Sequence, residues 1–233
     1  EVSRETKVVL SGQGADEVFA GYHWYPRVNA GSGPPADRYE KAFFDRDHLE
    51  ILEALDPEYH GENWSKQFVC NHFGLPGASH PVDQALRIDI TVMLVDDPLK
   101  RVDNMTMSWG LEARVPFLDH ELVELAAAMP PEIKLAGDGK AILKKAAERL
   151  IPREIIYRKK GYFPVPALKY LRGEYLDFVR EVLLSERARG RGLFRPEYVE
   201  KLLAAPEEHI TPLGGSKLWQ IALLEYWLEE MGC

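Results

Sequence analysis

The sequence predicts an α/β fold that is mostly helical within this chain and carries one short parallel strand near its N-terminus. Residues 7–10 form a short apolar run with a β-branched pair, followed at once by a glycine turn. From Pro81 onward, apolar residues recur at helical spacing. Of the 233 residues, 45% are hydrophobic and 28% are charged, which is ordinary for a globular protein and excludes a disordered or fibrous chain.

Residues 7–20 predict a strand, a loop and the start of a helix. The glycine turn follows the strand, and Asp16 and Glu17 then place carboxylates before an apolar stretch, which suits a helix N-terminus. No other segment of the chain has a convincing strand pattern, and a lone strand is not stable without partners. We therefore expect the rest of the sheet to lie upstream of Glu1 or in another chain.

The remainder of the chain is predicted to be helical, apart from its loops. An aromatic run at residues 22–27 leads into a glycine- and proline-rich loop at 31–35, and prolines break the chain again at 164–166. The expected helices cover residues 36–44, 48–55, 64–72, 81–94, 96–109, 120–129, 140–150, 167–171, 176–185, 196–204 and 216–231.

The charge and cysteine content exclude several classes of protein. Lysine and arginine number 29 against 37 acidic residues, a net charge of −8 that argues against a nucleic-acid partner. No apolar run approaches the length of about 18 residues that a membrane helix needs, and no signal-peptide pattern is present. Two cysteines cannot build a disulfide framework, which favours a reducing compartment. From these observations together we expect a cytoplasmic protein with no membrane partner.

The loop at residues 11–17 is the first segment with a pattern suited to chemistry. Its glycines allow close backbone approach to a ligand and leave N–H groups free to meet an anion. Asp16 is of a type that holds a divalent metal bridging phosphate oxygens. A structural turn with a capping acid explains the same residues equally well, so both interpretations stay open at this point.

Two later segments are candidates of the same kind. Residues 111–120 predict a packed apolar turn that holds Arg114 near Asp119. Residues 158–166 set three cations beside a glycine, two aromatic residues and two prolines, and a constrained lysine suits a phosphate ligand. Other polar groups are interpreted as structural, namely Cys70, His72 and His80 as a surface loop, Asp96 and Asp97 as helix N-terminal charges, and the arginines at 187–195 as a solvated turn.

In this order, the three segments resemble the synthetase domain of the asparagine synthetase family of glutamine-dependent amidotransferases. The family pattern S-G-E-G-S-D-E, followed by an apolar pair and G-Y, is close to residues 11–22 here. Residues 107–119 and 158–166 resemble the family's second and third patterns, and residues 140–147 resemble the helix before the third. The resemblance covers most of residues 7–175.

This resemblance implies that residues 1–233 are the C-terminal portion of a PP-loop type synthetase domain that uses ATP and Mg²⁺. Such enzymes adenylate a small carboxylate, and ammonia released from glutamine by an N-terminal glutaminase domain then displaces AMP to leave an amide. The family's first phosphate loop and the glutaminase with its catalytic cysteine are not found in these residues. We therefore expect the chain to be part of a longer protein and to be inactive alone, with assembly of further copies as one way to cover the strand edge.

The resemblance also assigns roles by position. Asp16 corresponds to the magnesium-binding aspartate, and Lys160 to the lysine that contacts the pyrophosphate side of ATP. Gln13 and Lys160 are the residues expected to take part in the chemistry. The nucleotide-binding residues are expected to be Ser11, Gly12, Gln13, Gly14 and Lys160.

Gln13 departs from the family pattern, which usually has glutamate at this position. A neutral amide cannot act as a base, but it can donate and accept hydrogen bonds. We therefore expect an acceptor other than free aspartate, such as a peptide or N-acylated amino acid, as in the subfamily that makes N-acetylglutaminylglutamine amide. The alternative is a binding or scaffold module derived from the family that has lost its chemistry, with Gln13 as one sign of that loss.

Overall fold

The computed structural model describes residues 1–159, 161 and 171–233. The described chain divides into two compact units, each of them mainly helical. The first unit comprises Glu1–Phe43 and Ser65–Lys159, and the second comprises Phe44–Trp64 and Lys160–Cys233. No helix among the described residues is long and apolar enough to cross a membrane.

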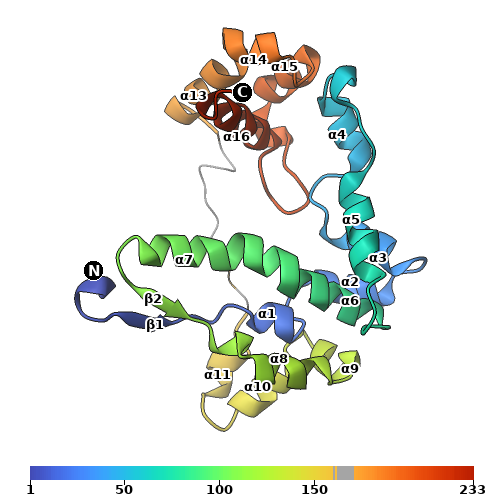
Figure 1. Ribbon diagram of the computed structural model, residues 1–233, viewed down its shortest axis with the longest axis vertical. Coiled ribbons are helices and arrows are strands. Elements are labelled where there is room, and N and C mark those ends of the chain that lie inside the picture. Colours follow the sequence, from blue (N-terminus) through green and yellow to red (C-terminus); the bar gives the residue numbers. More distant parts are fainter. Residues whose placement is uncertain (160, 162–170) are drawn as a thin grey trace. The chain divides into compact units, whose positions relative to one another are not determined.

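The first unit holds the two strands and most of the short helices (Figure 1). Its elements in chain order are β1 (Val8–Leu10), α1 (Ala15–Val18), α2 (Trp24–Ala30), α3 (Pro35–Phe43), α5 (Trp64–Phe73, which begins at the boundary), α6 (Pro81–Ile88), α7 (Lys100–Met107), β2 (Glu112–Arg114), α8 (His120–Ala127), α9 (Pro131–Leu135), α10 (Ala141–Ala147) and α11 (Arg153–Ile156).

The strand β1 has a partner within the chain, so the expectation of a lone strand is wrong. β1 and β2 pair in parallel, with Val9 opposite Ala113, and the Ser11 N–H extends the pairing to the Arg114 carbonyl at 2.8 Å. β2 was not predicted because it has only three residues, two of them charged and exposed, and therefore lacks a strand pattern. Tertiary pairing imposes this strand where local propensity does not.

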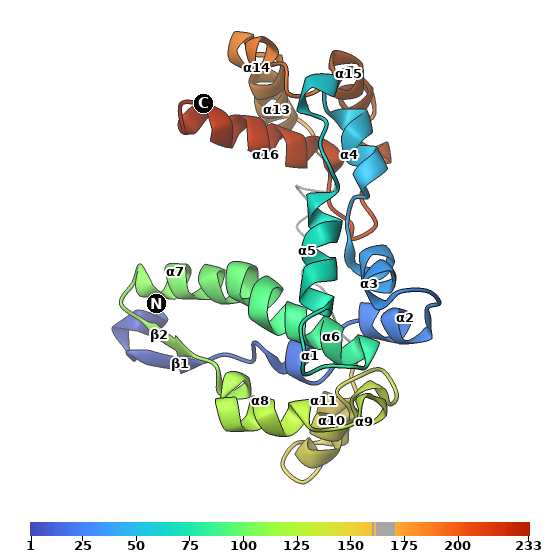
Figure 2. The ribbon, with the colours of Figure 1, turned by 45° about the vertical axis from the view of Figure 1, so that its right-hand side comes forward.

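A long helical rod, formed by α6, α7 and the residues between them (Pro81–Met107), runs through the first unit and leads to β2 (Figure 2). Pro81 at its first position and the His80 ring, which accepts from the Val82 N–H at 3.2 Å, start the rod as predicted. The sequence predicts that a second helix begins at Asp96, but the structure has one continuous helix there. Between α6 and α7 it contains π-helical stretches at Asp89–Met93 and Val95–Leu99. Gly110, at φ +61°, then turns the chain toward β2.

Asp89 lies in the first π-helical stretch and is completely buried. Its carboxylate accepts hydrogen bonds from Trp24 Nε1 at 3.0 Å, from the Tyr25 hydroxyl at 2.6 Å and from the Tyr39 hydroxyl. These donors come from α2 and α3, so a single carboxylate ties both helices to the rod. No helix was predicted from the sequence at α2, because the local pattern contains no sign of this tertiary acceptor.

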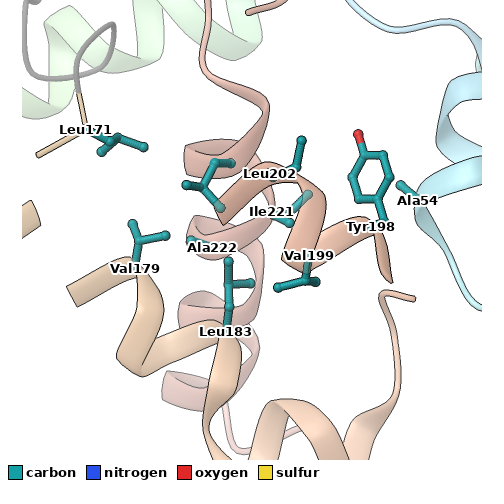
Figure 3. Close-up of a cluster of buried hydrophobic side chains, with 10 residues drawn as sticks. Ala54, Leu171, Val179, Leu183, Tyr198, Val199, Leu202, Ile221 and Ala222 are labelled. Atoms are coloured by element: carbon teal, nitrogen blue, oxygen red, sulfur yellow. The ribbon is translucent and has the colours of Figure 1, made fainter. Parts of the chain in front are cut away.

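The second unit is built around a conventional apolar core. It contains α4 (His48–Ala54), α13 (Glu174–Leu184), α14 (Glu186–Arg191), α15 (Pro196–Ala204) and α16 (Lys217–Glu230). Figure 3 shows side chains such as Val179, Leu183 and Leu202 gathered between these helices. All three are almost or fully buried.

Most predicted helices of the second unit are confirmed within two residues, but the arginine-rich turn is not a solvated turn. It forms α14, and Arg187 and Arg191 pair with Glu229 and Glu225 of α16. Arg195 donates to the Leu55 carbonyl at 2.8 Å. The expected helix at residues 167–171 lies, except for Leu171, outside the described residues.

Candidate functional site

The loop between β1 and α1 is shaped by two glycines in different ways. Gly14 adopts φ +91°, and a Cβ there would lie 2.4 Å from the Leu118 side chain, so the fold itself requires glycine at this position. A Cβ on Gly12 would meet nothing within 4 Å, and Gly12 is exposed. Packing within the described chain therefore explains Gly14, whereas Gly12 leaves open space beside the loop.

Gln13 is anchored through one end of its amide. Its Nε2 donates to the Pro98 carbonyl at 3.2 Å, in the second π-helical stretch of the rod. Because a carbonyl can only accept, this contact sets which end of the amide faces the rod. The other end, Oε1, is buried and has no hydrogen-bond partner in the described part of the chain.

Asp16 lies on α1, just beyond the loop, and forms an ion pair. Its Oδ1 is 3.0 Å from Lys140 Nζ, and both side chains are about a quarter exposed. Gly21 makes room for this pair, since a Cβ there would lie 2.1 Å from Asp16 Oδ1 and 2.9 Å from the Lys140 side chain. α1 is a single turn, so its dipole adds little to the binding of an anion.

Lys140, which pairs with Asp16, was not singled out as a candidate site residue from the sequence. Its N–H donates to the Phe19 carbonyl at 3.0 Å, and it adopts φ +54°, which is uncommon for a residue with a side chain. Gly139 reaches the same turn, where a Cβ would lie 2.3 Å from the Ala20 carbonyl oxygen. The segment Gly137–Lys140, with two glycines just before a helix, is the sequence signal that could have indicated a close backbone approach.

A hydrogen bond ties α1 to the residues that follow it. Glu17 is almost fully buried and accepts from the Tyr22 hydroxyl at 2.6 Å. Burial, with the hydrogen bond to Glu17, raises the pKa of Tyr22 well above its ordinary value, so the phenol remains a donor at physiological pH.

Lys160 lies outside the described residues, as do Tyr162, Phe163, Val165 and Pro166 of the same segment. The expected convergence of Asp16 and Lys160 on one polyphosphate therefore stays a prediction. Among the described residues, the cation that faces Asp16 is Lys140.

In the middle segment, Arg114 and Asp119 each contact a partner other than one another. Arg114 Nε pairs with Glu112 Oε1 of its own strand at 2.9 Å, and Asp119 caps α8 by accepting from the Glu121 N–H at 3.0 Å. Charges two apart on a strand share one face, which favours the observed pair. Asp97 pairs with Arg101 at 2.9 Å within the rod and does not lie at a helix start.

Comparison with known proteins shows which family this chain resembles over its length. The family model for asparagine synthase matches residues 1–229. The chain is 28% identical to asparagine synthetase [glutamine-hydrolyzing] 1 of Bacillus subtilis, over 97% of this chain and 41% of that protein. It is 33% identical to asparagine synthetase [glutamine-hydrolyzing] 3 of the same organism, over 81% of this chain and 30% of that protein.

A putative asparagine synthetase [glutamine-hydrolyzing] of Mycobacterium bovis is 29% identical over 81% of this chain and 34% of that protein. The chain thus spans less than half the length of these relatives. The match to the family nevertheless runs from Glu1 to Glu229, through the glycine loop, both strands and the rod. The chain belongs to the asparagine synthase family.

Proposed function

We propose that the protein carrying this chain is an ATP-dependent, amide-forming ligase of the asparagine synthetase type. The observation that supports this best is the Asp16–Lys140 pair beside the open Gly12 loop, in the segment that resembles the family's metal-binding pattern. A carboxylate and an ammonium side by side suit a magnesium–polyphosphate ligand, which presents both charges.

The residues present fit Mg²⁺ held jointly with a nucleotide. Magnesium commonly takes one or two carboxylates and completes its shell with phosphate oxygens and water. The described residues contain no group of three or more acidic, histidine or cysteine side chains suited to a metal, so Asp16 would share the ion with phosphates. Mg²⁺, when bound, would neutralise phosphate charge, while Lys140 would orient Asp16 and add positive charge and Lys160 would stabilise the departing pyrophosphate.

The proposed reaction has two steps. A carboxylate oxygen of the acceptor forms a bond to the α-phosphorus of ATP, and the bond to pyrophosphate breaks. Ammonia, supplied by glutamine hydrolysis elsewhere in the complete protein, then attacks the acyl carbon and AMP leaves with the bonding electrons. The proton lost from nitrogen passes to water or phosphate, since Gln13 cannot accept it as a base.

Gln13 directs the choice of acceptor. The Pro98 carbonyl holds Nε2, so the buried Oε1 is the end of the amide that can accept a hydrogen bond from the substrate. This oxygen is neutral, so it satisfies an N–H donor more readily than it compensates a full positive charge. This supports a carboxylate whose α-nitrogen is acylated, such as an N-acylated glutamine dipeptide, over free aspartate with its ammonium group.

Pyrophosphate release by the complete protein, measured across a panel of carboxylic acids, tests both proposals. We expect release with N-acylated dipeptides to exceed release with aspartate. Gln13→Glu is expected to shift the ratio of kcat/KM values toward free amino acids by about tenfold or more, because a carboxylate pairs with the ammonium. Gln13→Met, similar in length but apolar, is the control and is expected to weaken use of N-acylated acceptors without favouring aspartate.

Two outcomes would contradict these proposals separately. If Gln13→Glu improves aspartate amidation with no loss on other acceptors, the acceptor assignment is wrong. If no acid supports pyrophosphate release, the scaffold alternative replaces the ligase.

A further inference from the structure

Asp89 is unusual because it is a fully buried carboxylate whose three hydrogen-bond donors are all neutral groups. Burying an ionisable group is costly, and apolar side chains of similar size would often stabilise a core as well or better. What the carboxylate provides that an apolar residue does not is direction, since each donor must approach along an oxygen lone pair.

One set of contacts leads from Asp89 to α1. Trp24 donates to Asp89 at 3.0 Å, and the Trp24 ring stacks on Tyr22 with centroids 4.1 Å apart and planes 15° apart. Tyr22 in turn donates to Glu17, which neighbours Asp16 on α1. A one-turn helix has little stability of its own, so these contacts contribute to its orientation.

A second set of contacts leads from Asp89 along the rod to Gln13. Asp89 and Pro98 lie in the two successive π-helical stretches, and the Pro98 carbonyl accepts from Gln13 Nε2. π-Helical turns widen the helix locally and shift its register, and they occur frequently at functional sites. Tethering the rod at Asp89 therefore sets where the Pro98 carbonyl meets Gln13.

We propose that Asp89 is a positioning residue for the synthetase site, because its three hydrogen bonds hold α2 and α3 to the rod, and α2 and the rod orient Asp16 and Gln13 respectively. This inference rests on the proposed ligase function. It assigns no contact between Asp89 and a substrate, so its effect is on the alignment of groups that act together.

The test compares three variants of the complete protein by the kcat and KM of pyrophosphate release, each measured well below its melting temperature. Asp89→Ala removes the acceptor, and Trp24→Phe removes one donor while keeping a ring. We expect both to lower kcat by about tenfold or more, with the KM for ATP changed less than about threefold, because small misplacements of reacting groups are costly. Asp37→Asn, on α3 but paired with Lys66 at the surface, is the matched control and is expected to keep wild-type kcat.

Asp89→Asn serves as the conservative rescue. Its amide oxygen accepts from Trp24 and Tyr25, and its NH₂ group donates to the Tyr39 oxygen, so the kcat is expected to stay within about threefold of wild type. If Asp89→Ala fails to fold, Trp24→Phe carries the test alone.

Two results overturn the inference and differ from each other. Lowered melting temperatures with wild-type kcat in both Asp89→Ala and Trp24→Phe would show that Asp89 only stabilises the fold, and the proposed function would stand. A wild-type protein that releases no pyrophosphate with any acceptor would remove the proposed function and this inference together.

Discussion

Both units have an apolar core, which in the first unit includes Val18, Phe19 and Ala126, but they differ in the polar contacts that accompany it. In the first unit, the acceptor Asp89 gathers donors from α2 and α3, and glycines let backbone and side chains approach closely around Asp16. In the second unit, apolar side chains such as Leu202 fill the space between helices (Figure 3). Apolar burial is non-directional and tolerates repacking, whereas hydrogen bonds fix angles. The comparison teaches that the unit with the candidate site adds directional contacts, around a buried carboxylate with neutral donors, to its apolar packing.

The largest effect on stability is expected in the apolar core. Leu202→Ala should lower the free energy of unfolding by about 3–4 kcal/mol, because it leaves a cavity at a fully buried position. Leu223→Ala, at a leucine that is 49% exposed, is the control and should change it by less than about 0.5 kcal/mol. Urea denaturation measures both, and equal losses would mean that this core does not carry the second unit's stability.

The pH dependence of stability tests the contribution of the buried carboxylate of Asp89 in the first unit. Burial raises the pKa of Asp89 from its ordinary 3.8 to about 6, although the hydrogen bonds from Tyr25, Tyr39 and Trp24 lower it. Because the folded value lies above the unfolded one, the folded protein binds the extra proton between these values. The resulting stability is present below about pH 4 and is lost as pH rises through about 6.

Asp89→Asn removes this titration. Its stability relative to wild type should therefore rise by up to about 3 kcal/mol between about pH 4 and pH 7, measured by denaturation at a series of pH values. A difference that does not vary with pH would show that burial does not govern the ionisation of Asp89.

The paired glycines of the loop separate a requirement of the fold from a requirement of ligand binding. Gly14→Ala should cost about 2 kcal/mol or more, since it places a side chain at φ +91° against Leu118. Gly12→Ala should change stability by less than about 0.5 kcal/mol but weaken nucleotide binding, because its Cβ would point into open space that the proposed nucleotide would occupy. Denaturation and calorimetric titration with ATP and Mg²⁺ measure the two effects. Unchanged affinity in Gly12→Ala would contradict its assignment to the nucleotide site.

The smallest effect is expected at the sheet. Arg114 and Glu112 form an ion pair in which both side chains are more than half exposed, so Arg114→Ala should alter unfolding free energy by less than about 0.5 kcal/mol. Thermal denaturation at low and high salt checks this, and a large loss would mean that the pair, and not backbone pairing, holds β2 in place.

The sequence predicted elements whose signals are local. β1, the turn after it and the helix starts at Pro81 and Pro196 follow from residues that restrict their own backbone. The glycine loop that carries Gln13 and leads to Asp16 was also recognisable, because glycines and acidic residues mark such loops by composition.

Other features depend on partners far away in sequence. β2 exists because β1 pairs with it, α2 is held by Asp89 some 64 positions later, and Lys140 reaches Asp16 through a turn that its neighbouring glycine permits. No periodicity over a few residues encodes such pairings, since each is stabilised only when both members are in place.

By itself, the sequence determined the family, the glycine loop and the acidic residue beside it, because these are properties of short segments with restricted backbones. The tertiary structure, in the part that is described, decided that Lys140 pairs with Asp16, which end of the Gln13 amide is left to accept, and which carboxylate gathers the aromatic donors. Hydrogen bonds and ion pairs act over a few ångströms in space, whatever the separation along the chain, and so only the folded chain defines them.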